Sequence, residues 1–295
     1  MAQHKRWIEI SVEAEKTALD DLVNLLGRHC VGGAVVEERP GALTLVKGFL
    51  PEWESAIAEK LEIALLLLGK TVSISPPVIR IMAPEDWTES WKSYFEPQHI
   101  GQHTVIVPTW REYTAQPGEL IIHLDPGMAF GTGLHATTRL CLAAIEREIK
   151  PGVRALDVGT GSGILAIAMA KQGASQVEAI DIDPVAVHVA QDNLVLNGVT
   201  QVMVAQETLA SSLADDNLVH PGQGYDLLTV NIFADVIIAM SPAIARALRP
   251  GGVFIASGII ASRAEDVIIA LGQVELVLQD RQQEDDWVVL VGYRA

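Results

Sequence analysis

Residues 157–163 read Asp-Val-Gly-Thr-Gly-Ser-Gly, and this stretch decides the fold that the sequence predicts. It ends the apolar run 153–158 and leads into the apolar segment 164–172, so its three glycines stand between a predicted strand and a predicted helix. Glycines at such a turn let a ligand approach the backbone, and the helix N-terminus offers unpaired N–H groups. A strand–helix turn without a ligand is the plainer alternative, and the residues around the loop decide between the two.

The spacing around this glycine loop narrows the kind of ligand. A dinucleotide fingerprint requires glycine or alanine at its sixth position, where this chain has Ile164, and a P-loop requires Gly-Lys-Ser/Thr, which the stretch lacks. The next predicted strand, 176–182, contains Asp181, 22 residues after Gly159. A carboxylate there can accept hydrogen bonds from both hydroxyls of a ribose. The pattern indicates a nucleoside ligand, with Asp183 as the second candidate for the ribose contact.

From about residue 99 onward, apolar strands alternate with helices. This alternation is typical of an α/β fold with a doubly wound, mostly parallel sheet that is buried on both faces. The polar segment 206–224 contains glycine and proline and predicts a surface loop. The expected strands are 153–158, 176–182, 202–205, 227–231, 253–257, 275–279 and 287–293, and the expected helices are 164–172, 184–197 and 234–248.

The first 82 residues predict a smaller α+β domain. The order strand, helix, strand, strand, helix, strand is similar to a ferredoxin-like split sheet, with the second helix opening at Pro51 and the last strand at 72–82. No catalytic constellation occurs in this domain. We therefore expect residues 1–82 to recognise the substrate, 83–98 to form a helical linker, and 99–295 to be catalytic.

Four aromatic residues of the linker recur at helical spacing. Trp87, Trp91, Tyr94 and Phe95 stand at i, i+4, i+7 and i+8. Such a stripe packs a helix against one domain. The alternative is a rigid lever that fixes how the two domains face each other.

Composition and charge exclude several classes of protein. The chain has 295 residues, of which 21 are Lys or Arg and 37 are Asp or Glu, a net charge of −16. Binding to nucleic acid phosphates needs a basic surface, so we expect no nucleic acid partner. The longest apolar run is too short to cross a bilayer. The two cysteines, Cys30 and Cys141, suit a reducing cytoplasm, and His99 and His103 flank a glycine in a strand-like stretch, so no metal site is expected.

A second glycine-rich loop precedes the first. Residues 124–138 read Leu-Asp-Pro-Gly-Met-Ala-Phe-Gly-Thr-Gly-Leu-His-Ala-Thr-Thr and lead into a helix that starts near His135. Thr137 and Thr138 either cap this helix or bind a zwitterionic ligand. His135 is either a cap or packing residue or a group that transfers a proton.

A third motif is Asn231-Ile-Phe-Ala, at the end of a later predicted strand. In an open α/β sheet the carboxyl ends of the strands border the ligand crevice. The amide oxygen of Asn231 can accept an N–H of an attacking amine and so orient the nitrogen lone pair. The alternative is an asparagine that only ends the strand in a turn.

Together these motifs resemble the PrmA family, the methyltransferases that modify the eleventh protein of the large ribosomal subunit. The resemblance covers nearly the whole chain: the small first domain, the linker 86–97 (Asp-Trp-x3-Trp-Lys-x2-Phe-Glu-Pro), both glycine-rich loops and Asn231-Ile. Its most specific part is the string Phe-Gly-Thr-Gly-x-His-x-Thr-Thr at 130–138.

The resemblance implies S-adenosylmethionine as cofactor and a Rossmann-like methyltransferase sheet. It also implies repeated methylation of amines, on lysine side chains and the N-terminal α-amine of that ribosomal protein, a basic partner that suits the charge of −16. Asn231 corresponds to the residue at the acceptor amine and is the expected catalytic residue. The expected cofactor-binding residues are Phe130, Gly131, Thr132, His135, Thr137, Thr138, Gly159, Gly161, Asp181 and Asn231.

The chain departs from the family pattern in two places. Phe233 stands where the family more often has leucine, which changes the shape of the pocket and leaves the acceptor atoms unchanged. The long segment 206–224 changes the number of residues between Asp181 and Asn231, so this spacing is a weaker match to the family.

The expected reaction is in-line transfer from the sulfonium to a neutral amine, without a covalent enzyme intermediate or a dedicated base. Two alternatives remain open on the same fold. One is a methyltransferase of another protein lysine, a small molecule or a nucleic acid, against which the acidic surface and separate docking domain argue. The other is a non-catalytic binding module with a residual cofactor pocket, which Asp181 and Asn231 make less favourable.

Overall fold

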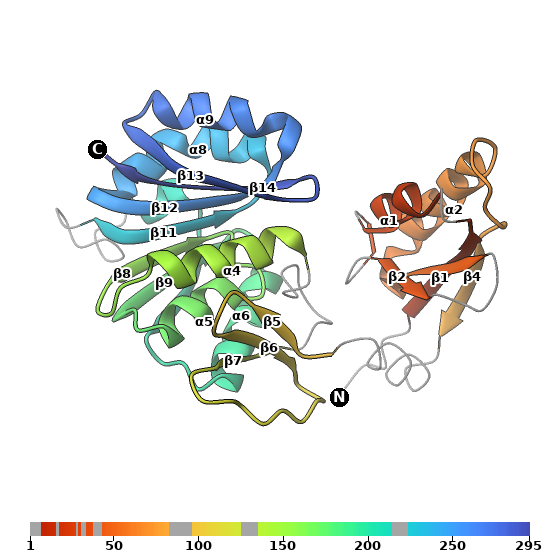
Figure 1. Cartoon of the computed structure of the whole chain (residues 1–295), viewed down its shortest axis with the longest axis horizontal. Coiled ribbons are helices and arrows are strands. Elements are labelled where there is room, and N and C mark those ends of the chain that lie inside the picture. The colour runs from red at the N-terminus through yellow and green to blue at the C-terminus, as the bar shows by residue number, and fades with distance from the viewer. Residues whose placement is uncertain are drawn as a thin grey trace. The chain divides into compact units, whose positions relative to one another are not determined.

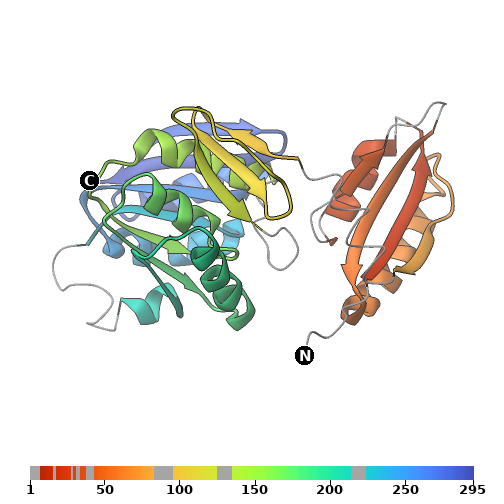
Figure 2. The same cartoon turned by 90° about the horizontal axis from the view of Figure 1, so that it is seen from below.

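The computed structural model describes residues 7–15, 18–27, 29–30, 34–37, 43–82, 96–124, 135–213 and 224–295. The chain divides into two compact units, Met1–Glu96 and Pro97–Ala295 (Figure 1, Figure 2). The division falls within the predicted linker. The aromatic stripe of that linker lies outside the described residues, so its packing stays a prediction, as does the recognition role of residues 1–82.

The first unit is a four-stranded antiparallel sheet with two helices. The sheet order is β2-β3-β1-β4, and α1 and α2 bury their apolar residues against β1 and β3. This order and connection confirm the ferredoxin-like prediction. The elements are β1 (Trp7–Ala14), α1 (Leu19–Gly27), β2 (Ala34–Glu37), β3 (Thr44–Pro51), α2 (Ser55–Leu68) and β4 (Val78–Met82).

Two predicted boundaries in this unit were wrong. Pro51 ends β3, and a 3-10 turn, Glu52–Glu54, separates it from α2. The last strand begins at Val78 and not at residue 72, because Pro76 and Pro77 have no N–H to donate to a ladder. Before them only the isolated bridge between Ala14 and Ile74 is formed.

The second unit is built on a seven-stranded sheet with the order β10-β9-β8-β11-β12-β14-β13. The first five strands in this order are parallel, and β14 is antiparallel to both of its neighbours. The doubly wound, mostly parallel sheet that the sequence predicts is thereby confirmed. The strands are β8 (Arg154–Val158), β9 (Gln176–Asp181), β10 (Val202–Gln206), β11 (Tyr225–Asn231), β12 (Leu248–Ile260), β13 (Leu276–Glu284) and β14 (Trp287–Arg294).

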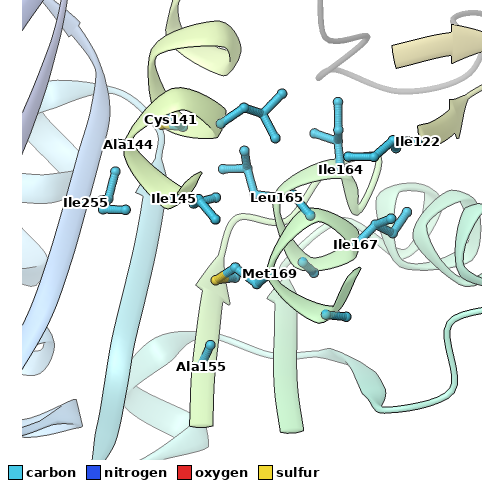
Figure 3. Packing of buried hydrophobic residues seen from close by; sticks show 14 of the residues in the cluster. Ile122, Cys141, Ala144, Ile145, Ala155, Ile164, Leu165, Ile167, Met169 and Ile255 are labelled. Carbon is cyan, nitrogen blue, oxygen red and sulfur yellow. The ribbon is translucent and has the colours of Figure 1, made fainter. Parts of the chain in front are cut away.

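Strand residues alternate between two apolar clusters, one on each face of this sheet. On β8, Ala155 belongs to the cluster with α4 and α5, and Leu156 to the cluster with α8 and α9. Figure 3 shows side chains of α4 and α5, among them Ile145, Leu165 and Met169, packed together near β8. The helices are α4 (Ala136–Glu148), α5 (Ile164–Lys171), α6 (Pro184–Leu196), α7 (Leu209–Ser212), α8 (Ala234–Ala247) and α9 (Ala264–Gly272).

The chain reverses its direction of winding between β8 and β11. From β8 it proceeds to β9 and β10 on one side, and it then returns to β11 on the other side of β8. In open α/β sheets ligands bind outside the carboxyl ends of the strands at such a switch point. The glycine loop after β8, Asp181 at the end of β9 and Asn231 at the end of β11 all lie at this edge.

Some elements were not expected from the sequence. The prediction of a surface loop at 206–224 was wrong for α7, where Leu209 and Ser212 are buried and Thr208 caps the helix. Residues 214–223 lie outside the described part. A three-stranded sheet formed by β5 (Gln98–Ile100), β6 (Thr104–Pro108) and β7 (Leu120–Leu124) was also missed, as was α9. In the described ranges, none of the helices has the length and apolar character needed to span a membrane.

Candidate active site

The glycine loop adopts a backbone that favours glycine at all three positions. Gly159, Gly161 and Gly163 have φ angles of 71°, 55° and 81°, in the left-handed region. The N–H groups of Gly159 and Thr160 donate to the carbonyl of Ile180 at 2.9 and 3.0 Å, which holds the loop against the end of β9. Gly163 is the N-cap of α5, so the loop runs into a helix N-terminus.

Asp181 faces this loop from the neighbouring strand. One of its carboxylate oxygens accepts from the N–H of Gly161 at 2.9 Å, and the other accepts from the N–H of Asp183 at 3.0 Å. Asp183 instead caps α6, where it accepts from the N–H of Val185 at 2.8 Å. Of the two candidate carboxylates, Asp181 is the one in contact with the glycine loop.

Asp157 is buried beneath the loop and links it to β11. Its two oxygens accept from the hydroxyls of Thr160 at 2.7 Å and Thr229 at 2.6 Å. Burial raises the pKa of Asp157 to about 6, opposed by these two hydrogen bonds and reinforced by the nearby charge of Asp181. Since Thr229 precedes Asn231 by two residues, a single carboxylate holds both the glycine loop and the strand that carries Asn231.

The Asn231 segment packs directly on the glycine loop. A Cβ atom added to Gly159 would lie 2.6 Å from Cγ2 of Ile232, and one added to Gly258 would lie 2.3 Å from the Ile232 carbonyl oxygen. Ile232 therefore occupies a slot between two glycines. Oδ1 of Asn231 is buried and has no hydrogen-bond partner among the residues that the structure describes. A buried acceptor of this kind requires a donor, and a bound ligand can supply one.

The start of α4 adds a second buried oxygen. His135 is the N-cap of α4, and its Nδ1 lies 2.8 Å from the Thr137 hydroxyl and 3.4 Å from the Thr137 nitrogen, which donates to it. The His135 ring contacts the Trp287 ring edge to face, with 4.8 Å between the ring centroids. Burial lowers the pKa of His135, and the charge of Arg139 lowers it further. The hydroxyl oxygen of Thr138 is buried without a partner within the described ranges.

Six of the sequence-predicted site residues lie on two structural features. Gly159, Gly161, Asp181 and Asn231 share the carboxyl edge of the sheet, and Thr137 and Thr138 lie in the first turn of α4. His135 has the geometry of a cap and packing residue, and its contact with a cofactor stays a prediction. The predicted residues Phe130, Gly131 and Thr132 lie outside the described residues.

Three side chains at the site were not singled out from the sequence. Thr160 and Thr229 donate hydrogen bonds to Asp157. For Thr229 the sequence did contain a signal, a hydroxyl residue among the apolar residues of β11. Ile182 follows Asp181 directly, and its side chain is 70% exposed. An exposed apolar side chain at this place can pack against the flat base of a nucleoside. The described residues include no cluster of His, Cys, Asp and Glu able to hold a metal ion.

This arrangement supports binding of a nucleoside beside an amine. The carboxylate of Asp181 can accept from ribose hydroxyls, and the glycine turn contacts this carboxylate through the N–H of Gly161. The free acceptor of Asn231 lies beside the same turn and can bind an N–H group. A nucleoside cofactor and a nitrogen acceptor can therefore meet at one edge of the sheet.

Comparisons with known proteins agree with this geometry. The chain matches the family described as "Ribosomal protein L11 methyltransferase (PrmA)" over residues 6–295. A ribosomal protein L11 methyltransferase from Chloroflexus aurantiacus is 39% identical, with 99% of each chain covered. One from Symbiobacterium thermophilum is 40% identical, over 98% of this chain and 99% of its own. The crystal structure of ribosomal protein L11 methylase from Lactobacillus delbrueckii subsp. bulgaricus is 34% identical, with a TM-score of 0.61 over 68% of this chain and 99% of that chain.

The first prediction concerns Asp181. Asp181→Ala should lower the affinity for S-adenosylmethionine at least about tenfold, because charge-assisted hydrogen bonds of roughly 1.5–3 kcal/mol are lost. Asp183→Ala is the matched control: it removes the cap of α6, which costs about 1 kcal/mol of stability, and should leave the affinity nearly unchanged. Calorimetric titration measures both. An unchanged affinity in Asp181→Ala would remove this residue from the site.

The second prediction concerns the pH dependence of stability. The Asp157 carboxyl has a pKa of about 6 in the folded protein and about 3.9 in an unfolded chain, so the folded state holds its proton more tightly. The protonated carboxyl therefore favours the folded state. Its contribution to the free energy of unfolding is complete below about pH 4 and is lost as the pH rises through about 6. Between those limits the wild type should lose about 2 to 3 kcal/mol relative to Asp157→Asn, which cannot titrate. Urea unfolding across this range tests it, and parallel pH profiles of the two proteins would contradict it.

Proposed function

This chain belongs to the ribosomal protein L11 methyltransferase (PrmA) family, and we propose that it methylates lysine side chains and the N-terminal α-amine of ribosomal protein L11. As a member of that family it is an S-adenosylmethionine-dependent protein methyltransferase. The observation that carries the proposal for amines is the buried Oδ1 of Asn231 at the glycine loop, which has no hydrogen-bond partner within the described ranges. An amide oxygen is an acceptor only, and a primary amine offers the N–H donors that it lacks.

The described residues fit the cofactor. Asp181 offers a carboxylate at the end of β9 in contact with the glycine turn, and Thr138 offers a buried hydroxyl without a partner in the part of the chain that the structure describes. We assign the ribose hydroxyls to Asp181 and the methionine part to the loop of Gly159 and Gly161 and to the start of α4. Bound S-adenosylmethionine would supply a methyl group on a positively charged sulfur. The sulfur is the leaving group and keeps the electron pair of the methyl–sulfur bond.

The protein's own part in the reaction is to hold and orient the amine. The oxygen of Asn231 accepts an N–H, which fixes the nitrogen and directs its lone pair toward the methyl group, and such positioning lowers the barrier. A free lysine has a pKa of about 10.4, so the amine must first lose a proton. Desolvation in the crevice lowers this pKa, and the proton can leave to water.

The cysteines do not provide a nucleophile. Burial raises the pKa of the Cys30 thiol to about 12, and it raises that of the fully buried Cys141 further still. Both thiols are therefore protonated and enclosed at neutral pH. Direct transfer to the amine, without an intermediate on the enzyme, is the mechanism that these residues support.

Charge and domain organisation support a division of labour. Residues 1–75 hold 8 basic and 11 acidic side chains, a net of −3, so −13 of the total −16 belongs to the rest of the chain. Long-range charge attracts a basic substrate and raises the rate of encounter more than it selects one partner. We assign selection of the ribosomal protein to the shape of the N-terminal unit, and we expect the enzyme in the cytoplasm, where its two free thiols stay reduced.

The third prediction concerns Asn231. If Asn231 orients the amine and does not also hold the cofactor, Asn231→Ala should bind S-adenosylmethionine within about twofold of the wild type and lose most turnover, on the order of a hundredfold, because the amine is no longer oriented. Asn231→Asp keeps an acceptor oxygen and should retain more activity than the alanine variant. Single-turnover methylation of ribosomal protein L11, followed by mass spectrometry, measures the rate. Activity of Asn231→Ala within twofold of the wild type would sink the assignment.

The fourth prediction separates recognition from chemistry. A fragment that begins at Pro84 retains the whole second unit, so it should bind S-adenosylmethionine as the full chain does. It should lose most methylation of ribosomal protein L11, because the N-terminal unit no longer delivers the substrate. Circular dichroism must first show that the fragment is folded. Full-rate methylation by a folded fragment would refute the recognition role of residues 1–82.

A further inference from the structure

Phe233 exposes an aromatic ring at the edge of the amine site. It follows Asn231 by two residues, and its side chain is 77% exposed. The residues on either side of it are held: Ile232 packs against Gly159, and Ala234 is buried. The backbone on both sides of the ring is therefore held, while the Phe233 side chain is largely exposed to solvent. It follows by two residues Asn231, whose Oδ1 has no hydrogen-bond partner among the described residues.

Helix stability does not explain a phenylalanine here. Phe233 is the N-cap of α8, a position where Ser, Thr, Asp and Asn are preferred because their side chains accept from the first turn. At the same edge of the sheet, α6 begins with Asp183, whose carboxylate accepts from Val185. Phenyl offers no acceptor, and only the Phe233 carbonyl serves the first turn of α8, accepting from Val236 and Ile237.

Burial does not explain it either. A phenylalanine stabilises a fold by leaving water, and this ring stays largely in water. Single exposed apolar side chains are ordinary on a protein surface. This one differs because it combines exposure, an unfavourable cap position and a place two residues after Asn231, at the carboxyl end of β11.

The chemistry of repeated methylation supplies a use for the ring. Each round begins when the ammonium form of the amine loses one N–H proton to water. The neutral nitrogen then forms a bond to one methyl carbon, and the methyl–sulfur bond breaks with its electron pair left on sulfur. The neutral amine thus has two N–H groups before the first round, one before the second and none before the third. The amide oxygen of Asn231 can hold the first two substrates by a hydrogen bond and cannot hold the third.

An aromatic face does not need an N–H. It attracts methylated ammonium groups through its ring quadrupole and packs against methyl groups. We propose that Phe233 forms the wall of the amine site that retains the dimethylated lysine, so that it determines how far methylation proceeds. The inference rests on the proposed function, in which Asn231 binds the amine.

The test compares Phe233→Ser with Phe233→Tyr in the full-length enzyme. Serine removes the ring and supplies a better N-cap, so the melting temperature should be equal to or above that of the wild type. Its third methyl transfer to ribosomal protein L11 should slow about tenfold more than its first, and dimethyllysine should accumulate. Phe233→Tyr keeps the ring and should give mainly the wild-type products. Mass spectrometry over a time course resolves the three transfers.

Tyr293→Ser is the matched control. Tyr293 is also an exposed aromatic of the same sheet, at 39%. It pairs with Val253, which itself pairs with Leu227 near the start of β11, away from the carboxyl edge. Its replacement should leave the product distribution unchanged. Equal slowing of all three transfers in Phe233→Ser, or an unchanged trimethyl fraction, would overturn the inference. A wild-type enzyme that methylates no amine of the ribosomal protein would instead refute the proposed function.

Discussion

The buried carboxylate of Asp157 is the interaction on which the site depends. It accepts one hydroxyl from the glycine loop, that of Thr160, and one from β11, that of Thr229. A buried charge without such partners would be costly, so the loop and the strand are each held where their hydroxyls can reach it. The same contact sets the distance between the cofactor side of the crevice and Asn231. One side chain thus joins the glycine loop to the strand that carries Asn231, the two parts of the proposed site.

Close packing around Ile232 completes this coupling. Neither Gly159 nor Gly258 can carry a Cβ without meeting Ile232, and both have positive φ angles. The two glycines let the turn after β11 descend between the glycine loop and the end of β12. Asn231 ends this strand with its amide oxygen buried and without a hydrogen-bond partner among the described residues. A substrate that donates an N–H group can supply the missing hydrogen bond.

The proposed site combines hydrogen-bond acceptors with exposed apolar side chains. The carboxylate of Asp181 and the amide of Asn231 are directional acceptors, suited to the ribose hydroxyls and the amine of the proposed reaction. Ile182 and Phe233, each just past one of these acceptors, are exposed apolar side chains. Methylation removes N–H donors from the substrate, so in the proposed reaction the apolar side chains contribute more to substrate binding at each successive methyl transfer. Recognition of the whole protein substrate is assigned elsewhere, to the N-terminal unit.

The sequence by itself predicted the sheet class, the element order of the first unit, the glycine loop after β8, and the places of Asp181 and Asn231 at the ends of strands. These follow from local patterns: apolar runs of strand length, glycines at a strand–helix turn, and polar residues at strand ends. The tertiary structure decided what depends on distant segments. Asp183 caps α6 and leaves the loop to Asp181, Thr229 reaches Asp157 across 72 residues of chain, and the short strands β5 to β7 exist only because they pair with one another. The exposure of Phe233 belongs to this second group, because burial is set by which neighbours the fold brings near, and a sequence pattern does not contain them.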